Sequence, residues 1–377
     1  MPLAPLDELA QLLRPAAGGL YLVSTGLAEQ RAVQAKIYGV EREDDIACAF
    51  RAALERIATA RVVVLGIPSD VGAGFRRGAN LAPQAIRAKL LDENPRLRED
   101  YMDSGIVDIG DVFVVPQLLH DSMLSSAQLS ATRGAIYGDH ADHAALPVSP
   151  LSIAERALDL VFALNPLVKP FVIGGDHSCA WPVSAALART RKNWGIVQPD
   201  AHTDLLPERL GVTYCFATWS YHANELIGRG GRLVQVGTRA SRRDRAHWES
   251  TLDVRQFWAK TCVADPEGTI DAIVAHLKRT GVDSVYFSND IDGTDDRWAD
   301  ATGTPEPGGV APDFLVELVR RLGADVGLCA GDLVEVAPAL ARNPSDDGTI
   351  ALAARYVRET LAAMLAPRSP NVPASDR

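Results

Sequence analysis

Four stretches of this 377-residue chain share one pattern, in which a mostly apolar run precedes carboxylate or imidazole side chains. The apolar runs are Pro170–Ile173, Trp194–Val197, Val282–Phe287 and Val326–Leu328. Their lengths and their content of β-branched and aromatic residues predict buried strands. The carboxyl ends of parallel strands share one edge of a sheet, where ligands of open α/β folds bind. We therefore expect the polar residues after these runs to converge on one crevice.

Six of these polar residues have side chains that bind divalent metal ions: His177, Asp200, His202, Asp204, Asp290 and Asp292. In extended chain, the alternation of a strand would place Asp200, His202 and Asp204 on one side, and Asp290 with Asp292. A mixed set of imidazole and carboxylate suits Mn²⁺, Ni²⁺, Fe²⁺ or Zn²⁺, and affinity alone does not choose among them. A single Asp or His at a strand end often caps the next helix, but the whole set predicts a centre for two ions.

Strand-like and helical runs alternate from Val62 to a final helix over Ile350–Leu365. This alternation predicts a three-layer α/β/α fold with a central, mainly parallel sheet. We divide the chain into an N-terminal helical extension (residues 1–60), a catalytic domain (61–366) and a disordered tail (367–377). The extension is expected to pack on the domain, with a lid over a neighbouring subunit as the alternative.

Residues 113–150 are rich in Ser, Ala and His, and we expect an irregular insertion there. Within it, Gly138–His143 contains two histidines and two aspartates, but no strand positions them, so a solvated loop is favoured over a metal site. Ser152 and Glu155 have the spacing of a capping box for a helix that ends near Leu164.

Composition excludes several classes of function. The formal net charge of −10 disfavours nucleic acid and anionic membrane surfaces as partners, and is compatible with a small cationic substrate. No apolar run reaches the roughly 18 residues of a membrane helix. The five cysteines are scattered without zinc or disulfide spacing, and the first residues lack the form of a signal peptide, so we expect a cytoplasmic protein.

Other motifs carry less weight. Gly72–Gly78 follows a strand-like run, but its GxGxxxG spacing is not that of a dinucleotide loop. Ser178 lacks the G-x-S-x-G setting of a hydrolase nucleophile. Cys179 and Cys215 are expected to be buried, inert thiols.

The four polar segments resemble those of the ureohydrolase (arginase/agmatinase) family: Gly174–Ser178, Asp200–Asp204, Ser288–Asp292 and Val334–Pro338. Further stretches resemble the family as well, namely Gly66–Pro68, Arg77–Arg87, Val107–Asp111, Val234–Gly237 and Ala301–Pro305. The resemblance covers roughly residues 62–365, and its motifs are specific to the family.

The resemblance implies a role for each matching residue. One ion would be held by His177, Asp200, Asp204 and Asp290, and the other by Asp200, His202, Asp290 and Asp292. A hydroxide between the ions would attack a guanidinium carbon. Asp204 and Glu335 are the implied catalytic residues: Asp204 would pass a proton to the leaving amine, and Glu335 would grip the planar cation with two parallel hydrogen bonds. Thr304 is an implied substrate contact.

Two departures from the family bear on the substrate. Leu206 stands where arginases have an Asn that helps to hold the amino-acid end of the substrate, which argues against L-arginine. Phe216 stands where arginases and agmatinases have a loop histidine that helps in proton transfer. His222 lies nearby and could substitute, but a solvated helix histidine is favoured.

An aromatic set near these positions comprises Tyr214, Phe216, Trp219 and Trp298, which would close a short pocket around a delocalised cation. Phe216, Trp219 and Leu206 are therefore predicted substrate contacts. Guanidine, or a short alkylguanidine, fits such a pocket best, and the resemblance is closest to the guanidine hydrolase branch, whose members use nickel rather than manganese. An agmatinase or a 4-guanidinobutyrase is the alternative.

Competing interpretations are weaker. Deacetylases share the implied fold but keep one zinc ion, whereas all six ligand positions are filled here. A regulatory subunit of a ureohydrolase complex would be expected to lose ligands. The resemblance also implies a homo-oligomer, either a trimer or a hexamer.

Overall fold

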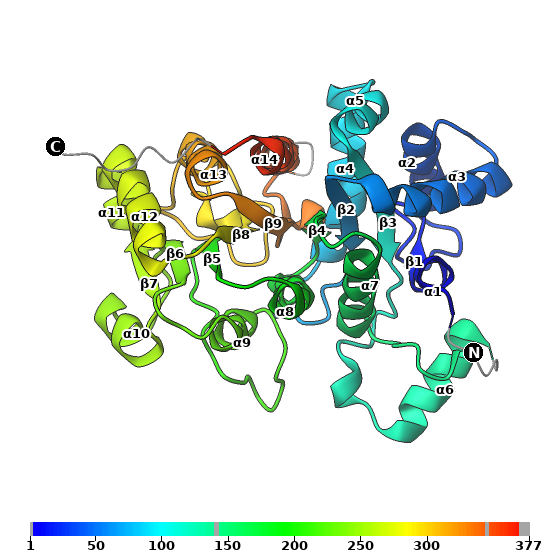
Figure 1. Ribbon diagram of the computed structural model, residues 1–377, viewed down its shortest axis with the longest axis horizontal. Helices are drawn as coiled ribbons and strands as arrows, with labels where there is room; N and C mark the ends of the chain where they lie inside the picture. Colours follow the sequence, from blue (N-terminus) through cyan, green and yellow to red (C-terminus); the bar gives the residue numbers. More distant parts are fainter. Residues whose placement is uncertain (1–2, 139–142, 344–346, 369–377) are drawn as a thin grey trace.

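A single nine-stranded sheet organises the described part of the chain, which comprises residues 3–138, 143–343 and 347–368 of a computed structural model (Figure 1). The strand order is β1-β3-β2-β4-β9-β8-β5-β6-β7. All neighbours are parallel except β1 and β3. The strands are β1 Leu13–Arg14, β2 Val62–Ile67, β3 Ile106–Val112, β4 Lys169–Gly174, β5 Trp194–Pro199, β6 Leu233–Thr238, β7 Arg255–Trp258, β8 Ser284–Asp290 and β9 Leu328–Val334.

Helices cover both faces of this sheet, which confirms the predicted three-layer α/β/α fold (Figure 1). One layer contains α1 Pro5–Leu12, α7 Pro150–Leu164, α8 Ala180–Thr190 and α9 Trp219–Leu226. The opposite layer contains α2 Leu27–Tyr38, α4 Ala82–Glu93, α12 Pro266–Thr280, α13 Pro312–Asp325 and α14 Gly348–Leu365. The remaining helices are α3 Glu43–Glu55, α5 Leu97–Ser104, α6 Ser126–Tyr137, α10 Arg245–Leu252 and α11 Ala259–Ala264.

The strands form where the predicted apolar runs lie because both faces of the sheet are buried. In β2, Val63 and Leu65 belong to the core under α7 and α8, whereas Val62 and Val64 belong to the core under α4 and α14. Alternate side chains of a strand point to opposite faces, so a strand covered on both sides must be apolar throughout. The sequence run at residues 62–67 has this character.

The segment before residue 60 is attached directly to the sheet. Leu13 and Arg14 of β1 pair with Val112 and Asp111 of β3 in antiparallel register. Gly110 permits this close approach, because a Cβ at that position would stand 2.0 Å from the carbonyl oxygen of Arg14. The short strand therefore extends the edge of the sheet that β3 would otherwise form.

The prediction of an irregular insertion at residues 113–150 is wrong, because the segment contains helix α6. Ser125 and Gln128 form a capping box at its start, a signal that the sequence carries and that we did not use. The predicted capping box at Ser152 and Glu155 is wrong, since Ser149 is the N-cap of α7. The Ser152 hydroxyl instead accepts a hydrogen bond from the backbone of Asp121 at 3.0 Å.

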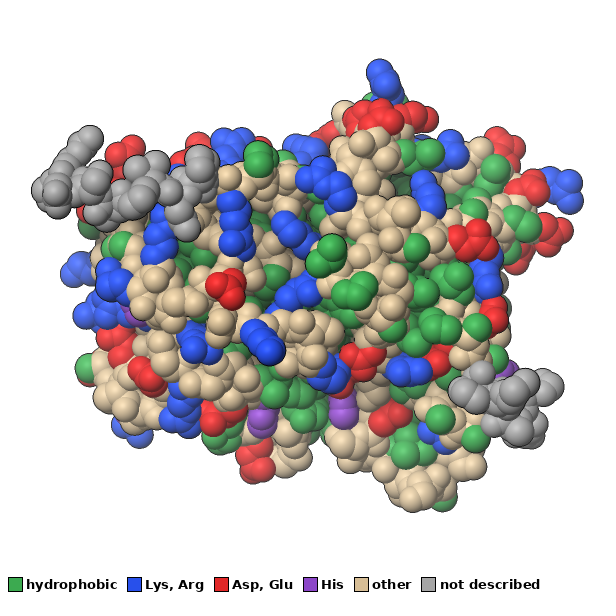
Figure 2. All heavy atoms as spheres, in the orientation of Figure 1, with side chains coloured by type: hydrophobic (Ala, Val, Ile, Leu, Met, Phe, Trp, Pro, Cys, Tyr) green, Lys and Arg blue, Asp and Glu red, His purple; other side chains and the backbone are tan. Residues whose placement is uncertain are grey.

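Two predictions concern residues that the structure does not fully describe. Within Gly138–His143, residues 139–142 lie outside the described part, and the same is true of the predicted tail from residue 369 onward. Among the described residues, no helix is both long and apolar enough to cross a membrane. On the face in Figure 2, both acidic and basic side chains reach the surface.

The four strands that carry the polar segments are consecutive neighbours at the centre of the sheet, in the order β4-β9-β8-β5. All four differ from their predicted bounds. The observed strands are β4 Lys169–Gly174, β5 Trp194–Pro199, β8 Ser284–Asp290 and β9 Leu328–Val334. All four end at the same edge because they are parallel. The fold therefore gathers their polar ends in one place.

Candidate metal centre

Three of the four polar segments leave their strands through the same local turn. A carboxylate oxygen accepts the backbone N–H two residues later in Asp176–Ser178 (2.8 Å), Asp200–His202 (2.6 Å) and Asp290–Asp292 (2.9 Å). Asp side chains favour such turns because they replace a backbone hydrogen bond. The D-x-H and D-x-D patterns therefore turn rather than continue as extended chain, which corrects the reason we gave for their convergence.

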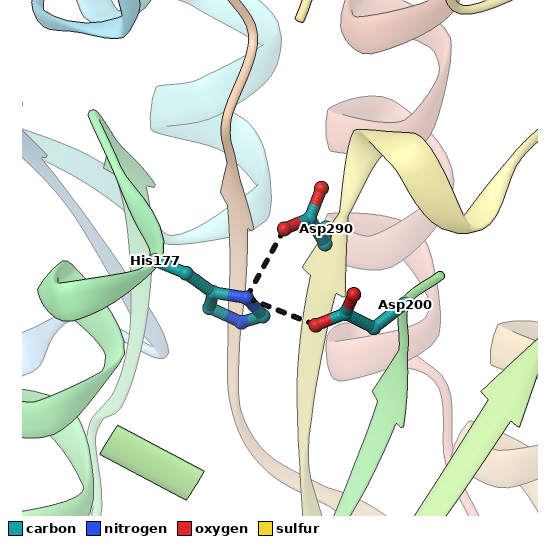
Figure 3. A group of neighbouring side chains, drawn as sticks. All are labelled: His177, Asp200 and Asp290. Atoms are coloured by element: carbon teal, nitrogen blue, oxygen red, sulfur yellow. Dashed lines mark ion pairs between the residues drawn. The ribbon is translucent and has the colours of Figure 1, made fainter. Parts of the chain in front are cut away.

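The first group of ligand-type side chains surrounds His177, in the 3₁₀ turn after β4 (Figure 3). Its Nδ1 atom lies 3.1 Å from Asp290 Oδ2 and 3.2 Å from the Oδ2 atoms of both Asp200 and Asp204. Among the described residues, none accepts a hydrogen bond from this buried nitrogen. Three carboxylate oxygens around one buried ring nitrogen form the donor set of a cation site.

The second group surrounds His202, whose side chain is 27% exposed at the edge of the cluster. Its Nδ1 atom lies 3.1 Å from Asp292 Oδ2 and 3.5 Å from Asp200 Oδ1. His177, Asp200 and Asp290, and separately Asp200, His202 and Asp292, form groups whose ligand atoms lie within 4.8 Å of one another. Asp200 belongs to both groups and presents one oxygen to each.

Thr304 and Glu335 lie against these groups. The Thr304 hydroxyl donates to Asp292 Oδ2 at 3.0 Å, and the backbone N–H of His177 donates to Glu335 Oε1 at 2.9 Å. Glu335 and Asp204 both have left-handed backbones, with φ of 63° and 51°. Such backbone angles are strained for residues other than glycine and gather at functional sites.

Burial sets the charge balance of the cluster. Removal from water raises the pKa of Asp204 to about 6, and the negative charge of Asp200 adds to the shift. Burial, together with the charge of Asp176, raises the pKa of Glu335 well above its ordinary value. Burial alone would lower the pKa of His177, but the carboxylates of Asp200, Asp204 and Asp290 raise it well above its ordinary value. The cluster therefore favours added positive charge, which metal ions or a cationic substrate would supply.

A cavity of about 570 Å³ adjoins the cluster, and the predicted residues His202, Asp204, Leu206 and Phe216 line it. Leu206 is 42% exposed at its mouth. Among the lining residues that sequence reasoning missed are Arg209, Arg242, Arg243, His247 and Trp248. A surface arginine carries no sequence signal of its own, so only the fold identifies these as neighbours of the site.

The predicted aromatic pocket is mostly absent from the lining of this cavity. Trp219 is fully buried under the cluster, where its Nε1 donates to Asp204 Oδ2 at 3.1 Å and its ring lies 4.6 Å from that of His177. Tyr214 stacks on Trp181 at 4.3 Å, and Trp298 lines a separate cavity beside Asp300 and Arg342. Only Phe216 of this set lines the site cavity, because α9 directs Trp219 into the core.

The other sequence candidates are also placed. His222 donates to or accepts from no cluster residue; its Nε2 lies 3.0 Å from the carbonyl oxygen of Pro207, and it does not line the cavity. Cys179 and Cys215 are buried free thiols, as expected. Burial raises the pKa of both.

The fold and site together define a class: an α/β/α protein with paired His/Asp groups, able to hold metal ions, at the carboxyl edge of its sheet. Comparison with known proteins is more specific. The model of the arginase family matches residues 60–363. The chain is 29% identical to a guanidinobutyrase of Pseudomonas aeruginosa, over 73% of this chain and 78% of that protein. It is 31% identical to an agmatinase of Chromobacterium violaceum, over 74% and 76%.

Solved structures agree with these relatives. The fold matches proclavaminate amidino hydrolase from Streptomyces clavuligerus with a TM-score of 0.63 and 27% identity, over 81% of this chain and 92% of that one. It matches the agmatine ureohydrolase of Thermoplasma volcanium with a TM-score of 0.60 and 26% identity, over 82% and 91%. The chain belongs to the arginase family. This confirms the ureohydrolase resemblance and identifies the protein as a hydrolase that acts on the C–N bonds of amidines.

Proposed function

We propose that the protein hydrolyses the C–N bond of a small guanidino compound, releasing urea and ammonia or an amine, at a centre of two divalent metal ions. The observation that carries this proposal is the ring of three carboxylate oxygens within 3.2 Å of the buried His177 Nδ1, with Glu335 accepting a hydrogen bond from the backbone of the same residue. Such a geometry is unfavourable without a cation, because buried carboxylates repel one another.

The ligand assignment follows the two groups. His177, Asp200, Asp204 and Asp290 would hold one ion, and Asp200, His202, Asp290 and Asp292 the other. The residues fit such ions, because the shared Asp200 presents Oδ2 to His177 and Oδ1 to His202. Two imidazoles with four carboxylates suit hard-to-borderline cations, and we propose Ni²⁺ or Mn²⁺.

When bound, the ions would supply an activated water as the nucleophile. The protein side chains would do the rest. Glu335 would pair with the guanidinium, oriented by its hydrogen bond from the His177 backbone. Asp204, with its pKa raised to about 6, would accept a proton and pass it to the leaving nitrogen. The donor Trp219 Nε1 fixes one oxygen of Asp204 for that role.

Guanidine remains our first candidate substrate, because Leu206 and Phe216 present apolar surface to the cavity and offer no hydrogen-bond partner to an α-ammonium group. A second candidate is a guanidino acid such as 4-guanidinobutyrate. Arg209, Arg242 and Arg243 line the same cavity and would attract a carboxylate tail. Agmatine carries a second positive charge, which these arginines would repel.

Urea release by the protein loaded separately with Ni²⁺ and Mn²⁺ tests the proposal. The substrates are guanidine, methylguanidine, 4-guanidinobutyrate, agmatine and L-arginine. We expect turnover of guanidine or of the guanidino acid and poor turnover of agmatine and L-arginine. No urea from any compound, with two ions bound per chain, would exclude the guanidino reaction and favour a formimino substrate or a regulatory subunit.

We further propose that the protein is cytoplasmic and forms a homo-oligomer, either a trimer or a hexamer. The location rests on the scattered cysteines without disulfide spacing, and the assembly rests on the family resemblance alone. The mass in solution, measured by light scattering after size-exclusion chromatography, tests the assembly, and a monomeric mass would contradict it.

A further inference from the structure

Three glutamines occupy paired positions on the three strands at one side of the sheet. Gln198 of β5 is in register with Gln235 of β6, which is in register with Gln256 of β7. All three side chains are fully buried, on the face covered by α9. Burying an amide is costly unless its donor and acceptor are both paired, so such a row in a sheet core requires a continuous set of partners.

The partners form one directed chain of hydrogen bonds. Trp258 Nε1 donates to Gln256 Oε1 (2.9 Å), Gln256 Nε2 to Gln235 Oε1 (2.8 Å), and Gln235 Nε2 to Gln198 Oε1 (2.9 Å). Gln198 Nε2 then donates to Asp200 Oδ2 at 2.7 Å. An indole N–H can only donate, and an ionised carboxylate can only accept. The two ends of the chain therefore fix the orientation of every amide between them.

The chain ends on the side chain that belongs to both ligand groups. Asp200 Oδ2, which receives the Gln198 amide, is the oxygen that faces His177 Nδ1. Asp200 Oδ1 accepts from the His202 backbone at 2.6 Å and faces the second group. The Gln198 amide therefore determines which oxygen of Asp200 serves which group.

Two side branches tie the chain to its surroundings. The Ser220 hydroxyl, in α9, donates to Gln198 Oε1 at 2.7 Å. Gln235 Nε2 also donates to the carbonyl oxygen of Thr203 at 2.5 Å. Thr203 lies between His202 and Asp204, so the same amide also holds the loop that carries these two ligands.

We propose that Gln198, Gln235 and Gln256 are positioning residues of the metal centre, and that their hydrogen-bond chain holds Asp200 in its bridging orientation before metal binds. The inference rests on the proposed role of Asp200 as a bridging ligand. A ligand that is already oriented loses less conformational freedom when the ion binds. Aligned amides also polarise one another, so a remote link contributes to the hydrogen bond at the carboxylate.

The test is a titration of metal-depleted protein with Mn²⁺ and, separately, with Ni²⁺. Binding is measured by calorimetry in the presence of a competing chelator. Gln198→Met keeps the approximate shape but cannot donate, and we expect metal affinity to fall about 10–100-fold, as for other residues that orient metal ligands. Gln256→Met removes the hydrogen bond to Gln235, which is separated from the Asp200 carboxylate by Gln235 and Gln198. We expect a smaller loss of metal affinity, although none of the proposed metal ligands is changed.

Gln30→Met is the matched control, because Gln30 is also a buried glutamine with a 2.6 Å hydrogen bond, to the carbonyl oxygen of Ala17 in the N-terminal segment. It should lower the melting temperature and leave metal affinity unchanged. If Gln198→Met also changes only the melting temperature, the glutamines are simple packing and the proposal is wrong. If Gln198→Met weakens metal binding and Gln256→Met does not, the hydrogen bonds of Gln256 have no role in metal binding, and the proposal of a chain of three positioning residues is wrong.

This titration involves no substrate, so its outcome is separate from that of the proposed function. Metal binding that depends on Gln198 and Gln256, without urea release from any guanidino compound, would retain the positioning chain and reject the substrate class. Urea release from a guanidino compound, with metal affinity unaltered in both variants, would retain the substrate class and reject the positioning chain.

Discussion

Glu335 and His177 are joined by a 2.9 Å hydrogen bond from the histidine backbone to the glutamate Oε1 atom. A second bond, from the Glu335 backbone to the carbonyl oxygen of Gly175, has a length of 2.7 Å and ties the same two strand ends. The Glu335 carboxylate, which we propose binds the substrate, is thus held by the turn that carries the proposed metal ligand His177. Its position relative to the ions is set by the backbone rather than by side-chain freedom.

Glu335→Gln should therefore reduce kcat/KM for the preferred guanidino compound by about 100-fold or more, since a charged partner of a buried cation is lost. The amide can still accept the His177 backbone hydrogen bond, so the turn should persist. Metal content measured by mass spectrometry should stay at the wild-type value. An unchanged kcat/KM would show that the guanidinium binds elsewhere.

His202→Ala should lower the metal content from near two ions per chain to near one, because His202 belongs to only one of the two groups. The fold should survive, since this side chain lies at the exposed edge of the cluster. His247→Ala is the control: His247 lines the same cavity outside both groups, and its loss should leave two ions bound. Two ions in both variants would contradict the ligand assignment.

Charge reversal of the cavity arginines should distinguish the two candidate substrates. Arg242→Glu with Arg243→Glu should raise KM for 4-guanidinobutyrate by about tenfold or more and leave KM for guanidine unchanged or lower. Arg245→Glu with Arg279→Glu, two exposed changes outside the cavity lining, alters the net charge by the same amount and serves as the control. Equal effects on both substrates would show that these arginines do not meet the substrate tail.

Asp332 should give the metal-free protein a measurable pH dependence. Burial raises its pKa from 3.8 to about 6, although His177, Tyr286 and Ser288 oppose the shift. The folded state therefore holds this proton more tightly than the unfolded state, and the associated stability is present below pH 3.8 and lost as pH rises through 6. Asp332→Asn has no such proton. Relative to wild type, it should gain about 2 kcal/mol of unfolding free energy between pH 4 and pH 7.

Denaturant unfolding of the chelator-treated proteins at pH 4, 5, 6 and 7 measures this difference. Each variant must be compared with wild type at the same pH, because other carboxylates titrate in both proteins and cancel. A difference that stays constant across the range would mean that Asp332 is ionised as easily in the folded protein as in water.

That His177, Asp200 and Asp290 lie at one edge of the sheet was predictable, because parallel strands end at the same edge. That β4, β8 and β5 lie near one another along that edge depends on the strand order, which the motifs do not reveal. The close spacing of these three side chains could not be predicted from the sequence. It depends on Asx turns after the strands and on the left-handed backbone of Asp204, which a pattern of alternate residues does not reveal.

The cavity wall was harder to predict than the ligands. Trp219 and Phe216 are three residues apart, yet one is buried under the cluster and the other lines the cavity. The direction of α9 decides this difference, and the direction of a helix after a long loop is a tertiary property. Arg242 and Arg243 follow β6, beyond the segments that carry motifs, so proximity to the site arises only from the neighbouring positions of β5 and β6.

The strand order also determines when the centre can be completed during synthesis of the chain. β4 and β5 are consecutive in sequence, but β9 and β8, which the ribosome makes much later, lie between them in the finished sheet. His177 and the Asp200–Asp204 segment must therefore wait on two unpaired strand edges until the last strands insert. Metal that arrives earlier would meet four of the six proposed ligands, because Asp290 and Asp292 come only with the end of β8.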